Sequence, residues 1–280
     1  MRDSIVVRCL TIVSAMFLAS IPAFPQVINA GLKGGFNWSW THSDDADFRS
    51  EYDIKGVPGF NGGAVFSFQL RKRYYLHTEL LYATKGRIVT GDLGLRDEVT
   101  YNYIEIPLIY QIHFKGSLGA KSAKQFKWYA GIGPNFSYWL GGKGTITHFE
   151  ITDHDVPEIP YTLRFGERPD ELSGESEFVY IRDARRIQVG VNIGGGVVVE
   201  PMNNRKIMVD VRFELGHSWL ADAESADYIF PQSYSSNLQT RNMGLRLSLM
   251  YLLQTNTDKK VRNKGKSNVV QKGKMIQKKK

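Results

Sequence analysis

The feature that most constrains this chain is an alternation of apolar and polar residues with a period of two. In the first of eight such segments the alternate residues Phe36, Trp38 and Trp40 are large and apolar. This period predicts β-strands with one apolar and one polar face. Most segments have the ten or so residues that a tilted strand needs to cross a membrane. The eight segments are residues 29–40, 58–70, 74–85, 99–114, 126–140, 187–200, 207–216 and 243–253.

The connections between these segments alternate in length. Residues 71–73, 115–125 and 201–205 are short to medium, whereas residues 41–57, 88–98, 141–185 and 217–237 are mostly longer. Bacterial transmembrane barrels place short turns in the periplasm and long loops outside the cell. The even number of strands then leaves both chain ends in the periplasm. We therefore predict an all-β fold, an eight-stranded antiparallel up-and-down transmembrane β-barrel over residues 27–253.

Aromatic residues gather near both ends of the expected strands, as in the interfacial belts of membrane barrels. The outer group is Trp38, Trp40, Tyr138, Trp139 and Trp219, and the inner group is Phe114, Phe126, Trp128 and Tyr251. No apolar run reaches the roughly 20 residues of a membrane-spanning helix. These two features favour a strand-based membrane protein.

Charged residues lie on the polar face of most expected strands. In a membrane barrel this face lines the lumen, and an eight-stranded lumen is just wide enough to be filled by side chains. We predict a lumen polar network that closes the barrel, made of Glu79, Glu105, Arg212, Glu214 and Arg246; Lys33, Lys85 and Asp210 share its face. The alternative is a soluble, lipocalin-like barrel whose charged face meets water. Strand length, the aromatic belts and the N-terminus favour the membrane barrel.

The N-terminus has the layout of an export signal. Arg2 and Arg8 precede an apolar run, residues 10–24, which is too short to span a bilayer. We therefore expect residues 1–26 to be a signal peptide, with a buried N-terminal helix as the alternative. Cys9 is the only cysteine and precedes the apolar run, so a lipid anchor at this residue is not expected.

The basic character of the chain is concentrated in its last residues. The formal net charge is +8, but residues 254–280 carry nine lysines and Arg262 against Asp258, so the rest sums to −1. A nucleic-acid-binding surface on the body is therefore not expected. We predict a disordered basic periplasmic tail at 254–280. It either binds an acidic protein, anionic lipid or peptidoglycan-associated material, or is only solvated. Its partner-binding candidates are Lys259, Lys260, Arg262, Lys264 and Lys266.

Catalytic, cofactor and metal sites are not expected. Residues 41–57 contain five carboxylates but no complete calcium-loop spacing, and His148 and His154 lack a usual zinc spacing. His217 and Ser218 are adjacent on an expected strand, so their side chains point to opposite faces and do not form a catalytic pair.

Several segments together resemble the PorT-like outer-membrane β-barrel proteins. They are GLKGGFN (31–37), GFNGG (59–63), ELLY (79–82) with Lys85 and Gly86, YIEIPL (103–108), YAGIGP (129–134) and residues 212–216. The resemblance covers about residues 28–253, and the tyrosine-x-glutamate-isoleucine-proline strand is its most specific part. It implies a barrel in the outer membrane of a Gram-negative bacterium. Some members are accessory components of the type IX secretion system.

Three functions follow as hypotheses. The first is a non-enzymatic accessory or structural component, with outer-membrane lipid and periplasmic or outer-membrane proteins as partners. The second is a lipid-modifying enzyme of the outer membrane. The third is a surface adhesion or ligand-binding barrel that uses the long outer loop 141–185. Nucleic acid is not an expected partner of any of them.

Overall fold

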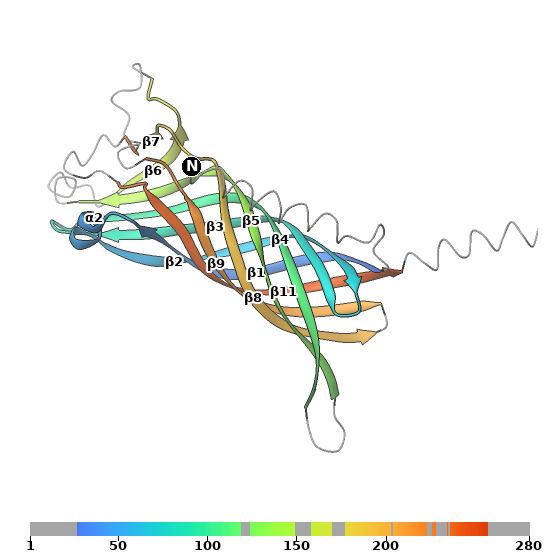
Figure 1. The fold of residues 1–280 in the computed structure, drawn as a ribbon. Helices are drawn as coiled ribbons and strands as arrows, with labels where there is room; N and C mark the ends of the chain where they lie inside the picture. Colours follow the sequence, from blue (N-terminus) through green and yellow to red (C-terminus); the bar gives the residue numbers. More distant parts are fainter. Residues whose placement is uncertain are drawn as a thin grey trace, which may run out of the picture.

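Eight long antiparallel strands form a closed ring (Figure 1). The computed structural model of the chain describes residues 27–118, 124–148, 158–169, 177–202, 204–222, 226–227, 234 and 236–256. The ring strands, in order around the barrel, are β1 (Val27–Ser43), β2 (Asp53–Arg71), β3 (Tyr74–Thr90), β4 (Arg96–Leu118), β5 (Lys124–Thr147), β8 (Ile187–Met202), β9 (Arg205–Trp219) and β11 (Thr240–Asn256). Pairing of β1 with β11 closes the ring. The predicted eight-stranded barrel is confirmed.

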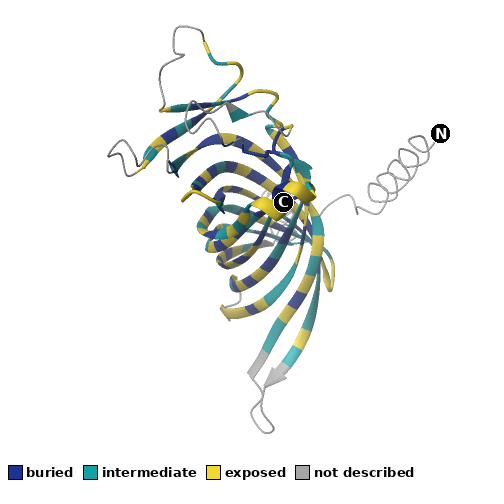
Figure 2. Ribbon diagram, turned by 90° about the vertical axis from the view of Figure 1, so that its left-hand side faces the viewer, coloured by how far each residue is buried: buried dark blue, intermediate teal, exposed yellow. Residues whose placement is uncertain are grey.

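The alternation in the sequence becomes an inner and an outer face. Figure 2 shows buried and exposed residues in alternate bands along the ring strands. On β1, Phe36 is 76% exposed on the outside, whereas Lys33 and Asn37 are buried inside. The exposed face carries leucine, isoleucine, valine and aromatic side chains on every ring strand. This is the inverse of a soluble barrel, and it fits a lipid-facing surface.

The ring strands continue past the expected outer ends, which corrects the predicted loops. Much of 41–57 and 88–98 is strand, and α2 (Ala46–Glu51) lies between β1 and β2. The expected loop 141–185 contains the end of β5 together with β6 (Ile159–Phe165) and β7 (Phe178–Ile181), and β10 (Ala226–Asp227) pairs with β7. Among the described residues no helix is long and apolar enough to span a membrane.

The outer extension has a hydrophobic core of its own. The core combines residues of β3, β4, β5, β6, β7 and α2 with Leu220, Ala221, Tyr234 and Leu238 from the β9–β11 connection. Trp139 belongs to this core, is fully buried, and donates from its Nε1 to the Gly141 carbonyl at 3.0 Å. The prediction that Trp139 belongs to the lipid-facing belt was therefore wrong. This core lies at the end of the barrel opposite the start of β1 and the end of β11.

The chain ends lie largely beyond this description. Residues 1–26, the expected signal peptide, and residues 257–280, which carry all five tail candidates, are outside the described residues. Residues 254–256 belong to β11 and pair with the first residues of β1. The barrel therefore extends three residues into the segment expected to be tail.

Close packing of β1 against β11 depends on Gly31. A Cβ atom at Gly31 would lie 1.8 Å from the carbonyl oxygen of Tyr251, whereas one at Gly34 would meet nothing within 4 Å. We expect Gly31→Ala to destabilise the closed ring by about 1–3 kcal/mol, because the backbones must separate at this point. Gly34→Ala is the matched control and should leave stability unchanged. Urea unfolding of both variants in detergent measures the difference, and equal midpoints would contradict the strain at Gly31.

Candidate functional site: the barrel lumen and its periplasmic mouth

Two groups of buried ion pairs fill the middle of the lumen. In the first, Arg212 donates to both carboxylate oxygens of Glu79, at 2.8 and 3.1 Å, and its Nε lies 2.9 Å from Asp210. Lys33 Nζ lies 3.1 Å from Glu79 and 3.2 Å from Asp210. His77 Nε2 is 2.9 Å from Glu79. Two cations and two carboxylates thus meet, and their side chains are at most 2% exposed.

The second group lies farther along the same strands toward the outside. Arg246 donates to both oxygens of Glu105, at 2.5 and 2.9 Å, and also to Glu214. Lys85 Nζ is 2.6 Å from Glu105 and contacts Glu214 as well. The Asn135 side chain donates to Glu214 at 3.0 Å. This group also balances two positive with two negative charges.

Several of these pairs cross the full width of the barrel. The β3 and β9 strands are separated by three strands on either side of the ring, and so are β4 and β11. Arg212 and Glu79 join β9 to β3, Lys85 and Glu214 join the same two strands, and Arg246 and Glu105 join β11 to β4. Direct contact between opposite walls closes the lumen at two levels.

All five residues predicted for the lumen network lie in these two groups. The structure adds Lys33, Lys85 and Asp210, which the sequence placed on the same face but not in the network. The signal that identifies them is charge balance, since the five predicted residues hold three carboxylates and only two cations. A buried ion without a counter-charge is costly, so a filled lumen needs equal numbers of positive and negative side chains.

A further polar layer separates the ion pairs from the outer core. Asn242 donates to the Tyr103 hydroxyl at 2.9 Å and to Gln188 at 3.1 Å. Above it, Arg87 donates to Ser236 and to the Asn237 carbonyl. The lumen is therefore filled by side chains from its middle to its outer mouth.

The comparisons with known proteins agree with this architecture. A family model described as an outer membrane protein β-barrel domain matches residues 23–218. The chain belongs to this family. It is an outer-membrane β-barrel of a Gram-negative bacterium. No curated protein matches the chain significantly.

Solved structures that match the chain include two outer-membrane proteins, at low identity and with TM-scores below 0.5. OprG from Pseudomonas aeruginosa is 12% identical with a TM-score of 0.44, and the match covers 82% of this chain and 95% of that one. Ail, the attachment invasion locus protein of Yersinia pestis, is 11% identical with a TM-score of 0.33, covering 81% of this chain and 98% of that one.

The periplasmic mouth of this outer-membrane barrel is a basic pocket of about 360 Å³. Five cationic side chains and one carboxylate, Glu200, are among its lining residues; the cations are Lys72, Arg73, Lys115, Lys127 and Lys206. Glu200 is shared, because it lies 2.7 Å from Lys127 and 3.8 Å from Lys206. The mouth therefore carries an excess of positive charge.

Aromatic rings form the floor of this pocket. The His113 ring lies between Tyr75 and Tyr129, with ring centres 4.1 and 5.3 Å away. Lys206 lies over the Tyr75 ring at 5.6 Å. The pocket thus combines cations with flat apolar surfaces.

Two of the acidic residues of 41–57, Asp44 and Asp45, have structural partners. Asp45 caps α2 by accepting from the amides of Asp47 and Phe48, at 3.0 and 3.3 Å. Asp44 accepts from Arg241 at 2.6 Å and from the Trp219 indole at 3.0 Å. Within the described ranges no three His, Cys, Asp or Glu residues are grouped as metal ligands would be. His148 is buried, and the other residues weighed for zinc, 153–155, lie outside those ranges.

Proposed function

We propose that this barrel is a non-enzymatic accessory subunit of a protein-secretion machine, similar to the PorT-like proteins, and that it binds a periplasmic partner at its inner mouth. The observation that carries the proposal is the basic pocket at that mouth, where five cations face one carboxylate. Such a surface attracts an acidic protein segment and orients it. The basic tail begins at the same end of the barrel, directly after β11.

The closed lumen supports an anchoring role rather than a conducting one. A solute that enters from the periplasm meets the ion pairs between Arg212 and Glu79 and then those between Arg246 and Glu105. Moving it onward requires several buried ion pairs to be broken at once, each of which leaves charges unpaired. We infer that the barrel acts through its rims.

The residues weighed for an enzyme support the non-enzymatic role. Ser218 Oγ accepts a hydrogen bond from the Val189 amide at 3.0 Å, so its oxygen holds two strands together. Of the hydrogen bonds between described residues, none joins Ser218 to His217. A nucleophile needs a base within hydrogen-bond reach.

Partner capture after in-cell crosslinking tests the proposal. We compare the full chain with a chain ending at Asn256, which keeps all of β11, and with the triple variant Lys72→Ser/Arg73→Ser/Lys115→Ser. We expect the full chain to retain periplasmic or outer-membrane proteins in mild detergent and the triple variant to lose most of them, because rim charges govern association. The truncated chain reports the contribution of the tail separately.

The matched control removes three cations at the opposite end. Arg49, Lys55 and Arg96 are exposed on the outer side of the barrel, and their replacement by serine should leave capture intact. Equal capture by the full chain and both periplasmic variants would refute docking at the mouth. A lone barrel in every sample would refute the subunit role altogether.

A further inference from the structure

The apolar band on the outside of the barrel ends abruptly at a fork in the sheet. The β5 strand pairs with β8 as far as Tyr138 and with β6 from Gly142 onward. Tyr138, Leu140 and Ile187 are exposed at the fork, at 39%, 41% and 73%. These are the last large apolar side chains of this part of the band, so the fork marks the outer edge of the hydrocarbon region.

Three cations lie at this edge. The Arg186 guanidinium lies 4.6 Å from the ring centres of both Tyr138 and Phe165, and its Nε donates to the Trp139 carbonyl at 3.2 Å. Arg164 lies 5.0 Å from the ring centre of Phe178. These contacts hold both guanidinium groups in place beside the edge.

Lys143 completes the set on the same surface. It pairs in register with Thr162 on β6, and Arg164 follows two residues later, so Lys143 and Arg164 share the outward face. Within the part of the chain that the structure describes, no carboxylate lies within 4 Å of the charged atoms of Lys143, Arg164 or Arg186. Two guanidinium groups held by contacts, together with Lys143, thus lie at a membrane edge without a carboxylate partner among the described residues.

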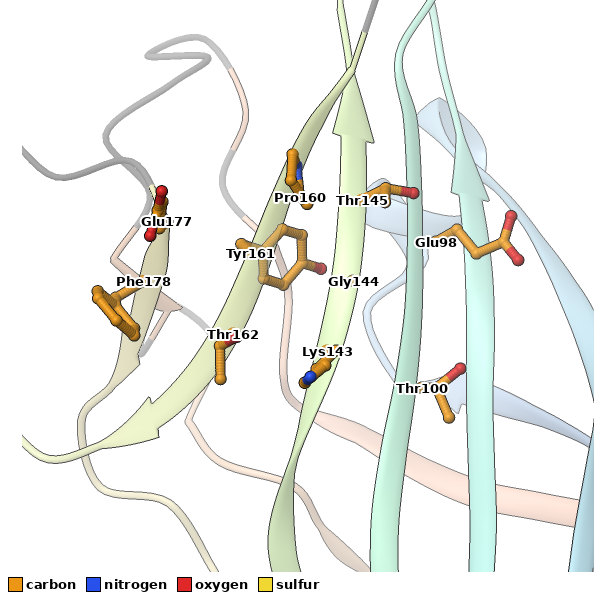
Figure 3. Close-up of a pocket in the computed structure, with 10 residues that line it drawn as sticks. All are labelled: Glu98, Thr100, Lys143, Gly144, Thr145, Pro160, Tyr161, Thr162, Glu177 and Phe178. Carbon is orange, nitrogen blue, oxygen red and sulfur yellow. The ribbon is translucent and has the colours of Figure 1, made fainter.

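A pocket of about 540 Å³ opens beside Lys143 on the side away from the membrane (Figure 3). Its lining comes from four neighbouring segments, β4, β5, β6 and the start of β7. The hydroxyl-bearing residues Thr100, Thr145 and Thr162 share it with the Phe178 ring. Of its two carboxylates, Glu98 is paired with Arg96 at 2.7 Å, and Glu177 lies with Phe178 at the far end. Hydroxyls, carboxylates and an aromatic ring are groups that bind sugar hydroxyls and the apolar face of a sugar.

We propose that this surface, the fork cations with the adjoining pocket, binds a phosphorylated glycolipid of the outer leaflet. The order of chemistry outward along β5 is Leu140, Lys143 and Thr145. In such a lipid the acyl chains lie in the hydrocarbon, and the phosphates and sugars lie together at the headgroup level. An apolar residue followed outward by a cation and hydroxyl groups is complementary to that arrangement. Arginine and lysine side chains form charge-assisted hydrogen bonds with phosphate. A basic patch at the headgroup level contributes roughly 1 kcal/mol per cation near an anionic membrane surface.

The position of the surface favours this occupant over a protein partner. The fork cations adjoin exposed apolar residues that are in permanent contact with lipid, so the nearest anions are those of the lipid headgroups. A simple phospholipid would satisfy the cations but leave the hydroxyl-lined pocket without a sugar. The proposal is independent of docking at the periplasmic mouth, which lies at the other end of the barrel.

Lipid binding by the full-length barrel in phosphatidylcholine nanodiscs tests the proposal. The probes are bisphosphorylated lipid A, dephosphorylated lipid A and phosphatidylglycerol, and native mass spectrometry measures the bound fraction. We expect the wild-type barrel to prefer bisphosphorylated lipid A over the other two. The variant Lys143→Ser/Arg164→Ser/Arg186→Ser should bind it at least about 10-fold more weakly.

The matched control is Lys72→Ser/Arg73→Ser/Lys115→Ser, which removes the same charge at the periplasmic end and should bind lipid A as the wild type does. Heat-modifiable migration verifies that each variant folds. The comparison of the three lipids on the wild-type barrel tests the lipid preference even if a variant fails to fold. Equal binding of phosphatidylglycerol and lipid A, or equal loss in both triple variants, would overturn the site. Failure of partner capture at the mouth would leave this result unaffected.

Discussion

Replacing Glu105 by leucine is expected to destabilise the folded barrel by roughly 3–5 kcal/mol. The substitution leaves Arg246 and Lys85 with only Glu214, so one positive charge stays buried without a counter-charge. It also removes the contact between β11 and β4 across the lumen. Urea unfolding in detergent and heat-modifiable migration measure the loss.

The double variant Glu105→Leu/Arg246→Met is the matched control. It removes the pair as a unit and leaves Lys85 with Glu214, so the second group is neutral again. Replacing a buried ion pair by apolar residues is often close to neutral for stability. We therefore expect the double variant to regain most of the lost stability. If Glu105→Leu unfolds at the wild-type urea concentration, the network does not hold the barrel together.

Replacing Trp139 by alanine is expected to loosen the outer extension while the ring stays closed. Trp139 is fully buried and meets Tyr101 and Phe165 edge-on, with ring centres 5.2 and 4.9 Å apart. Truncation of a buried tryptophan costs about 3–5 kcal/mol, because a cavity remains where the ring was. The cost falls on the outer core, since this residue lies above the ion pairs.

Limited proteolysis of the barrel in detergent micelles measures this local loss of stability in the outer extension. We expect faster cleavage within residues 141–185 of Trp139→Ala, with folded-barrel migration retained on unheated gels. Trp38→Ala is the control, because Trp38 is 52% exposed on the lipid-facing surface. A cleavage rate equal to that of the wild type would show that the outer core does not depend on Trp139.

The sequence was enough to predict which face of a strand each residue lies on, because successive side chains along a strand alternate between the two faces. Every charged residue of the lumen network differs by an even number of positions from its neighbours on the same strand, as Asp210, Arg212 and Glu214 do. The ion-pair partners could not be predicted in this way. Glu105 and Arg246 are 141 residues apart in sequence, and their contact depends on the stagger of all the strands between them.

The outer extension was missed for a different physical reason. Along β4, Val99, Tyr101 and Tyr103 point inward and are buried, whereas Ile104 and Ile106 point outward and are exposed. The apolar face therefore changes sides between Tyr103 and Ile104. Below this point lipid surrounds the barrel, and above it water does, so the same strand follows opposite patterns. On β5 the expected segment 126–140 ends close to this inversion, whereas on β4 the expected segment 99–114 crosses it.

The ion pairs that join opposite walls have a consequence for how the barrel enters the membrane. Arg212 and Glu79 meet only when β9 and β3 face each other, and that requires the β1–β11 seam to be shut. An open, curved sheet would keep pairs within one strand or between neighbouring strands, such as Arg212 with Asp210, but would lose the pairs that join opposite walls. Such an intermediate is unfavourable in hydrocarbon. Membrane insertion and closure of the β1–β11 seam are therefore coupled in a single cooperative step. Partly closed barrels are then sparsely populated in the bilayer.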